Sequence, residues 1–456
     1  MKKFVAFFKK SMSCETLSYR QVMGIIIPII IDTVLLAFIG MINTAMVSSS
    51  GPGIVSATSL TGAINNVFQC LFTAAATGGS IIISQYKGKG DYKKLRSSIG
   101  ELFSVMVTMA LFIATILIVF GKQIFLLFYG ALDDQNVINY GIIYLVGISI
   151  TYPVFNFYQA GLSALRSMGD GRACMAISLT TGIVNILSNC VTIYMLKLGI
   201  YGIIISTTLN RFSAAFMVIF FLKKFHPELD IKMKTIFGHN KEDFKKLINV
   251  SVPFVLEQVF FNCGNLVNAS FMTMCGAVAV ETNSIVGGMG IYHNPTCGIE
   301  NGSVSIIGQC VGAGKPKEAR RMLNNLIIFS TSITVVLAVI LMPLVQYIML
   351  AFTPSPEAAE LIPNVYRLNL LGWLVFGASS TIGAAGLRAS GDAFYTSVGA
   401  MTAMWVVKIG LGYLLAIQLG FGVYGMAIAS VSEWAARGTL FTIRRFSRHW
   451  CAKKLI

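Results

Sequence analysis

The stretch PIIIDTVLLAFIGMINTAMVSSSGP, residues 28–52, returns in altered form 225 residues further along the chain. The positions that keep this spacing are Pro28 and Pro253, Asp32 and Glu257, Asn43 and Asn268, and Gly51 and Gly276. Internal repetition is examined before single motifs because it determines the architecture. This stretch therefore predicts a chain made of two similar halves.

Two further pairs of motifs follow the same order with one to three residues of slippage. SQYKGKGDYKK at 84–94 corresponds to GQCVGAGKPKE at 308–318, and LRSMGD at 165–170 corresponds to LRASGD at 387–392. The repeat thus extends over most of each half.

The composition indicates the environment of these halves. Of 456 residues, 55% are hydrophobic and 12% charged, and the mean hydropathy is +0.72. Soluble domains carry about 25% charged residues, so an ordinary cytosolic enzyme is excluded. The net charge of +16 is compatible with nucleic acid or membrane as a partner, but basic residues set among so many apolar ones favour the membrane.

Neither the cysteines nor the amino terminus changes this interpretation. The nine cysteines show no C-x-x-C spacing, so we expect small core residues without a metal or redox role. The lysine-rich start resembles a signal peptide, but the apolar run at 22–47 is too long for one and is expected to be a retained first span.

A membrane helix needs about 20 mostly apolar residues, and twelve segments qualify. They are 22–47, 54–84, 98–120, 138–160, 174–196, 200–222, 247–273, 279–309, 323–350, 363–387, 394–417 and 422–444. The fold class is therefore predicted to be all-α and integral to the membrane, with twelve transmembrane helices.

The basic residues predict the orientation, because cytoplasmic loops retain Lys and Arg. Most of the 35 basic residues fall at the termini and in alternate loops, whereas the opposite loops hold only Lys122 and Lys197. Both termini are then cytoplasmic. Since six spans are an even number, the two halves are expected to be related by a pseudo-two-fold axis along the membrane normal.

This pattern gives five predicted regions. They are a cytoplasmic segment 1–21, a six-helix lobe 22–222, a cytoplasmic linker 223–246, a second six-helix lobe 247–444 and a basic cytoplasmic tail 445–456.

Several stretches together resemble the multidrug and toxic compound extrusion (MATE) transporters. Besides residues 28–52, they are ATGGSIIISQYKGKGD at 76–91, GLSALRSMGDGRACMAISLTTGIVNILSN at 161–189, GAAGLRASGD at 383–392 and SEWAARGTLFTIRRFSRHW at 432–450. The resemblance covers both halves in order. It implies two six-helix lobes forming a V, and export of organic substrates coupled to inward sodium or proton flow.

This chain differs from the family at the cation site, where amides stand in place of two carboxylates. The resemblance implies an aspartate fifteen residues after the proline of the first span, and an asparagine followed four residues later by an aspartate in the fifth. Counting from Pro28, these carboxylate positions hold Asn43 and, after Asn185, Asn189. An amide offers a carbonyl oxygen but neither charge nor titration, so proton coupling through these two positions is not expected.

Asp32 is the expected substitute for the missing carboxylates. Eleven residues separate it from Asn43, which places both on one helix face about 16 Å apart. With Asn185, Asn189 and Thr207 they are predicted to form a polar pocket, and Na⁺ is a possible occupant at Asp32, Asn43, Asn185 and Asn189. The alternative is that these groups only bond between helices.

The second half offers more ionisable groups inside spans, each costly there and therefore a functional candidate. Glu257 repeats the position of Asp32, Asn262 follows it, and Lys408 lies mid-span. We expect a switchable Glu257–Lys408 pair, with snorkelling of Lys408 to an interface as the alternative.

The eighth span is the most polar and is expected to line the cleft, with Glu281, His293 and Glu300 as candidates. His293 titrates near neutral pH when unperturbed, which suits a proton carrier, although a bonding role between helices is also open. Glu300 is alternatively placed at the cytoplasmic mouth near Lys315 or Arg320.

The GAGKP motif and the repeated LRSMGD and LRASGD motifs are not expected to bind substrate. GAGKP at 312–316 resembles a phosphate loop, but Lys315 is followed by proline and no strand precedes it, so ATP hydrolysis is not expected. In the two repeated motifs, Arg166 with Asp170 and Arg388 with Asp392 are predicted to pair across one helical turn and fix loops.

The sequence therefore predicts a secondary-active exporter and not an enzyme. We expect no cofactor beyond the coupling ion, Na⁺ or H⁺, and an organic, cationic or amphipathic substrate, because carboxylates in a low-dielectric cleft attract positive charge. A monomer in a bacterial-type plasma membrane, with no nucleic acid, is expected. The alternatives are a lipid-linked sugar flippase and a non-transporting scaffold. The acidic residues inside the spans, with Lys408 as the only deep cation, argue against the flippase.

Overall fold

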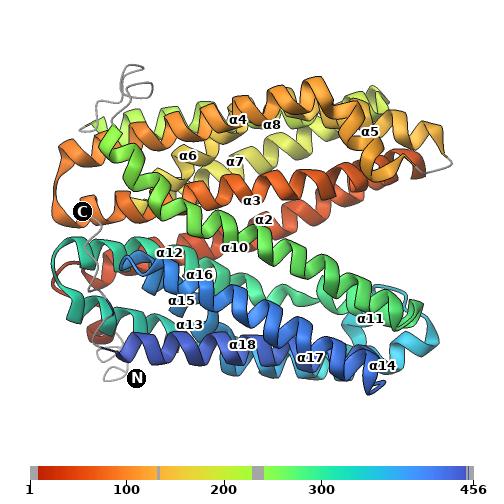
Figure 1. Ribbon diagram of the computed structural model, residues 1–456. Coiled ribbons are helices and arrows are strands. Elements are labelled where there is room, and N and C mark those ends of the chain that lie inside the picture. The colour runs from red at the N-terminus through yellow and green to blue at the C-terminus, as the bar shows by residue number, and fades with distance from the viewer. Residues whose placement is uncertain (1–8, 131–133, 228–240, 448–449, 451–456) are drawn as a thin grey trace. The chain divides into compact units, whose positions relative to one another are not determined.

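The computed structural model describes residues 9–130, 134–227, 241–447 and 450 (Figure 1). Within these ranges the regular structure is helical and contains no strand, as predicted. Most of the predicted linker, residues 228–240, and residues 448–449 and 451–456 of the basic tail lie outside the described residues.

The first half of the chain forms six helical stretches separated by turns. They are α2 (Tyr19–Ser48), α3 (Pro52–Lys89), α4 (Tyr92–Tyr129), α5 (Gln135–Ile150) with α6 (Tyr152–Ser167), α7 (Gly171–Asn189) with a π-helical extension (Cys190–Met195), and α8 (Gly199–Phe225). The α5–α6 pair bends by 52°. The bend is explained by Pro153, which lacks the N–H that would continue the helical ladder.

The second half forms six more stretches, several of them interrupted. They are α10 (Lys241–Met274); α11 (Ala277–Gly288), the 3₁₀ turn Gly290–Tyr292 and α12 (His293–Gly312); α13 (Pro316–Leu350); α14 (Pro356–Gly372), the π-helix Trp373–Gly377 and α15 (Ala378–Ala389); α16 (Ala393–Thr402), the π-helix Ala403–Ile409, α17 (Gly410–Gly412) and the π-helix Tyr413–Gln418; and α18 (Gly422–Phe446). Short π-helical segments widen the turn and change which face a side chain takes.

These stretches occupy the twelve predicted segments. In the described part of the chain, nine are long and apolar enough to cross a membrane, or ten if the bent α5–α6 pair counts as one span. The other two, 277–312 and 422–446, carry more polar residues or breaks. The architecture of an all-α membrane protein is confirmed.

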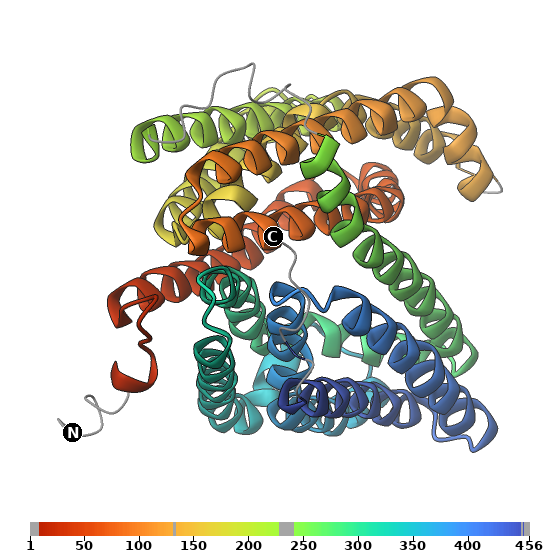
Figure 2. The same ribbon diagram turned by 60° about the vertical axis from the view of Figure 1, so that its left-hand side comes forward.

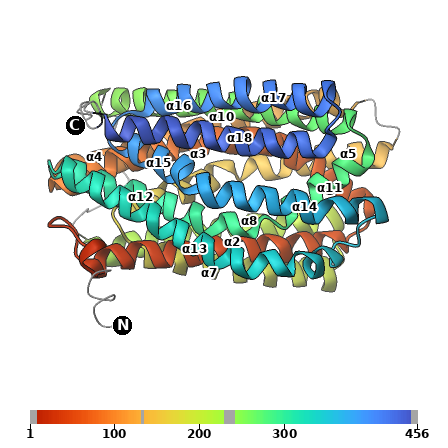
Figure 3. The ribbon, with the colours of Figure 1, turned by 90° about the horizontal axis from the view of Figure 1, so that it is seen from below.

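Contacts divide the chain into two compact units, Ile27–Val255 and Met1–Ile26 with Leu256–Ile456. We call them the first and the second unit. Within each unit the helices lie side by side along a common direction (Figures 1, 2 and 3). The predicted lobes, 22–222 and 247–444, follow the spans, whereas the contacts divide the chain inside α2 and α10.

Polar contacts explain why these two helices are shared. In the first unit, the Ser97 hydroxyl donates to the Asp243 carboxylate at the start of α10. In the second unit, Asn325 Nδ2 donates to the Ser11 carbonyl over 2.6 Å, and Arg321 donates to the Lys10 carbonyl over 3.0 Å. The start of α10 is thus bonded to the first unit, and the residues that precede α2 are bonded to the second unit.

Close packing depends on glycine at particular positions. A Cβ on Gly425 of α18 would lie 2.6 Å from the backbone nitrogen of Ala416. A backbone atom cannot move aside as a side chain can, so α18 contacts the π-helix Tyr413–Gln418 only because residue 425 has no side chain.

Candidate functional site

The three candidate amides of the first unit meet. Asn189 Nδ2 donates to Asn43 Oδ1 over 2.6 Å and lies 3.4 Å from Asn185 Oδ1, and the Ser206 hydroxyl donates to Asn189 Oδ1. The resemblance to the MATE transporters implied that these positions of α2 and α7 lie together, and the hydrogen bonds show that they do. The amides satisfy one another and bring no formal charge to the cluster.

Beside the amides is a pocket of about 380 Å³ inside the first unit. Asn43, Asn185 and Thr207 contribute polar groups to it, and Leu36 and Ile39 contribute apolar ones. No acidic side chain is among the described residues that line it, and its one charged residue is Arg211 of α8.

Arg211 is held by carbonyl, hydroxyl and aromatic groups. Its Nη1 donates to the Ile148 carbonyl over 2.7 Å and to Thr151 Oγ1 over 2.5 Å. The guanidinium carbon lies 5.5 Å from the ring centre of Tyr152 and 4.9 Å from that of Phe155. Cation–π contacts of this kind stabilise a desolvated guanidinium.

Sequence analysis missed Arg211, although a signal was available. A lone arginine inside the apolar segment 200–222 meets the same criterion as Asp32 or Lys408. Lys408 is therefore not the one deep cation of this chain, and that argument against an anionic substrate no longer holds.

Asp32 is not in the amide cluster. Its carboxylate is buried, with the residue 1% exposed, and lies 3.5 Å from the Arg166 guanidinium. The expected set of Asp32 with Asn43, Asn185 and Asn189 is thus divided between an ion pair and a neutral cluster. A Na⁺ ion at the amides would have no carboxylate ligand among the described lining residues.

The predicted Arg166–Asp170 pair is wrong. α6 ends at Ser167, so the four-residue spacing does not lie on one continuous helix. Asp170 instead accepts a hydrogen bond from the Ala173 N–H over 3.1 Å, capping α7, and lies 3.4 Å from His226.

The second unit repeats the acid–arginine pair. Arg388 Nη2 lies 2.5 Å from Glu257 Oε1, and the Ser397 hydroxyl donates to Glu257 Oε2 over 2.8 Å. Asp32–Arg166 and Glu257–Arg388 thus occupy matching repeat positions. The predicted Arg388–Asp392 pair is wrong, because α15 ends at Ala389.

The predicted Glu257–Lys408 pair is also wrong. Arg388 occupies the place beside Glu257, and Lys408 lies in the π-helix Ala403–Ile409, where helical counting no longer gives the face. Lys408 instead interacts electrostatically with Glu433 and Arg437. Glu433 is 1% exposed, and its Oε1 lies 2.9 Å from Arg437 Nη1.

Glu300 joins these groups. Its electrostatic neighbours are Arg388, Arg437 and Glu257, so the alternative placement near Lys315 or Arg320 is wrong. We call the following set the charged network: Glu257, Glu300, Arg388, Lys408, Glu433 and Arg437. It holds three carboxylates and three cations. Neither Glu433 nor Arg437 was among the candidates predicted from the sequence.

The other three candidates of the second half lie outside the network. Glu281 accepts hydrogen bonds from the Ser355 N–H and hydroxyl, each over 2.7 Å. His293 Nδ1 lies 3.0 Å from the Gly290 carbonyl, and its ring packs 4.2 Å from that of Trp373. Asn262 donates to the Gln258 carbonyl of its own helix over 2.8 Å. These contacts favour structural roles.

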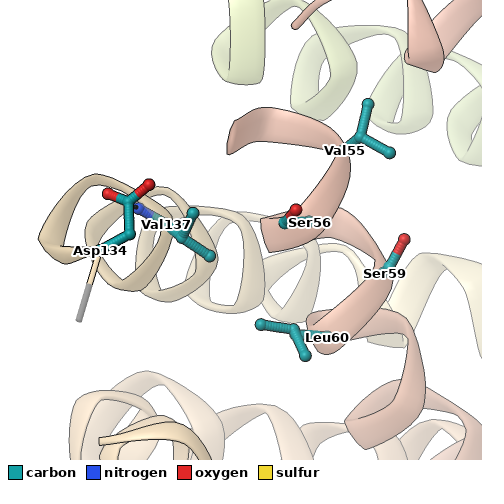
Figure 4. A pocket seen from close by; sticks show the side chains of 6 residues that line it. All are labelled: Val55, Ser56, Ser59, Leu60, Asp134 and Val137. Carbon is teal, nitrogen blue, oxygen red and sulfur yellow. Dashed lines mark hydrogen bonds between the residues drawn. The ribbon is translucent and has the colours of Figure 1, made fainter. Parts of the chain in front are cut away.

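A second pocket of the first unit has a structural explanation. It measures about 590 Å³ and lies between the first turns of α3 and α5 (Figure 4). Its one acidic residue, Asp134, accepts hydrogen bonds from the N–H groups of Asn136 and Val137, over 2.9 and 3.4 Å, and so caps α5.

Cys14 and Cys310 contact each other, whereas the cysteines were expected to be separate small core residues. Cys14 Sγ lies 3.8 Å from Cys310 Sγ, and the Glu318 carboxylate lies near both. Their shared hydrogen bond lowers the pKa of Cys14 to about 7. This cluster belongs to the second unit and contacts neither the pocket nor the charged network.

Comparison with known proteins identifies the family. The MatE family model matches residues 28–191 and 253–414, two segments that begin 225 residues apart, at Pro28 and Pro253. The chain belongs to the MatE family. The internal repeat is therefore the family's own repeat, and the chain is a multi-pass membrane transporter of this type.

Relatives of the MatE protein span nearly its full length. The uncharacterized transporter YisQ of Bacillus subtilis is 26% identical, over 93% of this chain and 94% of YisQ. The probable multidrug resistance protein NorM of Thermotoga maritima is 21% identical, over 94% and 93% of the two chains.

Solved structures share the fold. A MATE crystal structure in the bent conformation has a TM-score of 0.85 at 16% identity, covering 96% of each chain. A MOP superfamily transporter of Pyrococcus furiosus has a TM-score of 0.86 at 16% identity, covering 98% of this chain and 99% of its own. For that protein, a reverse polarity of the binding pocket was taken to suggest a different function.

Proposed function

We propose that this MatE-family protein is a secondary-active exporter that moves an organic solute outward in exchange for protons. It works as a monomer in the plasma membrane, with both termini in the cytoplasm. The family, the repeated halves and the distribution of basic residues support this proposal. The pocket of the first unit receives the solute, and the charged network of the second unit carries the coupling ion.

The observation that carries the proposal is the composition of the charged network. Its three carboxylates interact with Arg388, Arg437 and Lys408, so a Na⁺ ion at these carboxylates would be repelled by three positive charges. A proton adds its charge to a carboxylate directly and needs no such space. Proton coupling therefore fits this site better than sodium coupling.

Glu300 is the carboxylate best suited to exchange that proton. Glu257 and Glu433 are held by Arg388 and Arg437, whereas the Glu300 side chain makes no hydrogen bond or ion pair within 4 Å with any described residue. Protonation of Glu300 would change the network from neutral to a charge of +1. Such a change in a low-dielectric interior is large enough to bias a conformational equilibrium.

Proteoliposome transport tests this proposal. Efflux of a cationic dye, ethidium, and of an anionic one, 2-naphthoate, is measured under separately imposed pH and sodium gradients. We expect the pH gradient to drive transport of at least one probe, and Glu300→Gln to abolish it. Glu360→Gln, an exposed carboxylate of α14, is the matched control. Transport that only a sodium gradient drives would contradict proton coupling.

The lipid-linked sugar flippase remains a second candidate because of one observation, the arginine in the pocket. A diphosphate lipid would be attracted by Arg211. Flipping of such a lipid in vesicles without any ion gradient would favour this candidate over the exporter.

A further inference from the structure

The pocket of the first unit has the polarity opposite to that expected from the sequence. Its single charged group is Arg211, and no acidic side chain is found among the described residues around it. An arginine side chain stays protonated in proteins. The pocket is therefore electropositive.

Arg211 also has unused hydrogen-bonding capacity. A guanidinium carries five N–H donors, and both hydrogen bonds that Arg211 donates to described residues use Nη1. The Nε and Nη2 groups form the other edge of the fork, and they have no protein partner among the described residues. That edge has the spacing that binds a carboxylate through two parallel hydrogen bonds.

The carboxylate that the sequence predicted for this region, Asp32, already has a counter-ion. Asp32 lies 3.5 Å from Arg166, and these two charges offset each other. Asn43, Asn185 and Asn189, which stand at the family's acidic or amide positions, are neutral and bonded to one another. Nothing in this cluster neutralises Arg211.

The rest of the lining suits an organic body. Leu36 and Ile39 provide apolar surface, and Tyr144, Phe155 and Tyr158 provide aromatic faces. A volume of about 380 Å³ is within the range of about 300–1,000 Å³ typical of small-molecule sites. The pocket can therefore enclose an aromatic ring system next to the guanidinium.

We propose that this pocket binds an organic monocarboxylate with an apolar or aromatic body, whose carboxylate pairs with the Nε–Nη2 edge of Arg211. The assignment rests on the proposed export function for its physiological meaning, but the binding itself does not require transport. It replaces the cationic substrate expected from the sequence.

Binding to the purified full-length protein in detergent tests this proposal independently of transport. Three probes share one ring system and differ in charge: 2-naphthoate, 2-naphthyl phosphate and 2-naphthyltrimethylammonium. Equilibrium dialysis gives the Kd of each. We expect 2-naphthoate to bind most tightly, because a planar carboxylate matches the fork.

Two variants locate the site. Arg211→Gln is expected to weaken 2-naphthoate binding about 10- to 100-fold, since hydrogen bonds to charged groups contribute about 1.5–3 kcal/mol. Arg172→Gln removes an exposed arginine beyond the pocket and is expected to leave Kd unchanged. Asn185→Asp adds a carboxylate to the lining and is expected to weaken 2-naphthoate while strengthening the trimethylammonium probe.

Each outcome has a definite meaning. Tighter binding of the trimethylammonium probe to the wild type, equal binding of 2-naphthoate by Arg211→Gln, or no binding of any probe overturns the proposal. Preference for 2-naphthyl phosphate shows that the site takes phosphates and also overturns the carboxylate assignment. Normal 2-naphthoate binding without any gradient-driven transport would refute the exporter while leaving this inference standing.

Discussion

Breaking the Glu257–Arg388 ion pair is expected to destabilise the second unit strongly. The pair joins α10 to α15 with a nitrogen–oxygen distance of 2.5 Å, and the side chains are 7% and 12% exposed. Glu257→Gln keeps the shape and the bond from Ser397 but removes the negative charge that lies 2.5 Å from the buried Arg388 guanidinium. Breaking a buried pair from one side costs about 3–5 kcal/mol, so we expect a loss of about 3 kcal/mol in the free energy of unfolding.

The Asp32–Arg166 pair of the first unit allows the size of this loss to be compared between two similar ion pairs. With an effective dielectric constant of about 20, the attraction is ~7 kcal/mol at 2.5 Å and ~5 kcal/mol at the 3.5 Å of Asp32–Arg166, before desolvation. Asp32→Asn should therefore cost less than Glu257→Gln, by about 2 kcal/mol at most. Both values are measured by unfolding in mixed detergent micelles.

A double-mutant cycle separates the pair from its surroundings. Arg388→Gln in the Glu257→Gln background should recover most of the lost stability, because no uncompensated charge remains. Glu360→Gln, exposed on α14, should change the free energy of unfolding by less than about 0.5 kcal/mol. Additive single and double variants would refute the reasoning.

Two further predictions concern packing and pH. Gly425→Ala should cost about 2 kcal/mol or more, because its Cβ would lie 2.6 Å from a backbone nitrogen, whereas Gly287→Ala, with open space around it, should be neutral in the same unfolding assay. Burial raises the pKa of Asp170, but the contact with His226 and a backbone hydrogen bond outweigh it and hold this pKa below its ordinary value. The stability that Asp170 contributes should thus be full above about pH 4, the unfolded-state range, and be lost as the pH falls further. Unfolding of the wild type and Asp170→Asn from pH 7 to pH 3 measures this; a difference that grows on acidification would contradict it.

The meeting of Asn43 with Asn189 was expected from the resemblance to the MATE transporters. The helical segments and the repeat followed from spacing and hydropathy. The ion pairs of Arg166 and Arg388 did not, because both helices end before the expected partner. Pairing across helices depends on how each helix is rotated against its neighbour, which one sequence does not give.

The interrupted helices explain the other differences. Lys408 lies in a π-helical segment, where the usual 100° per residue no longer applies, so its pairing with Glu257 was not predictable by counting. Arg211 was detectable from composition alone. Its place in the pocket followed only from the geometry, because a lone arginine inside a span can equally pair with a carboxylate on a neighbouring helix.

The contacts divide the chain inside α2 and α10, and not between the two halves of the sequence. A cut within residues 228–240 would produce two six-helix fragments, and neither would contain a complete unit. The first fragment would carry residues 9–26, which pack in the second unit, and the other would carry residues 241–255, which pack in the first. Co-expressed fragments should therefore associate by exchanging their leading arms, as domain-swapped partners do.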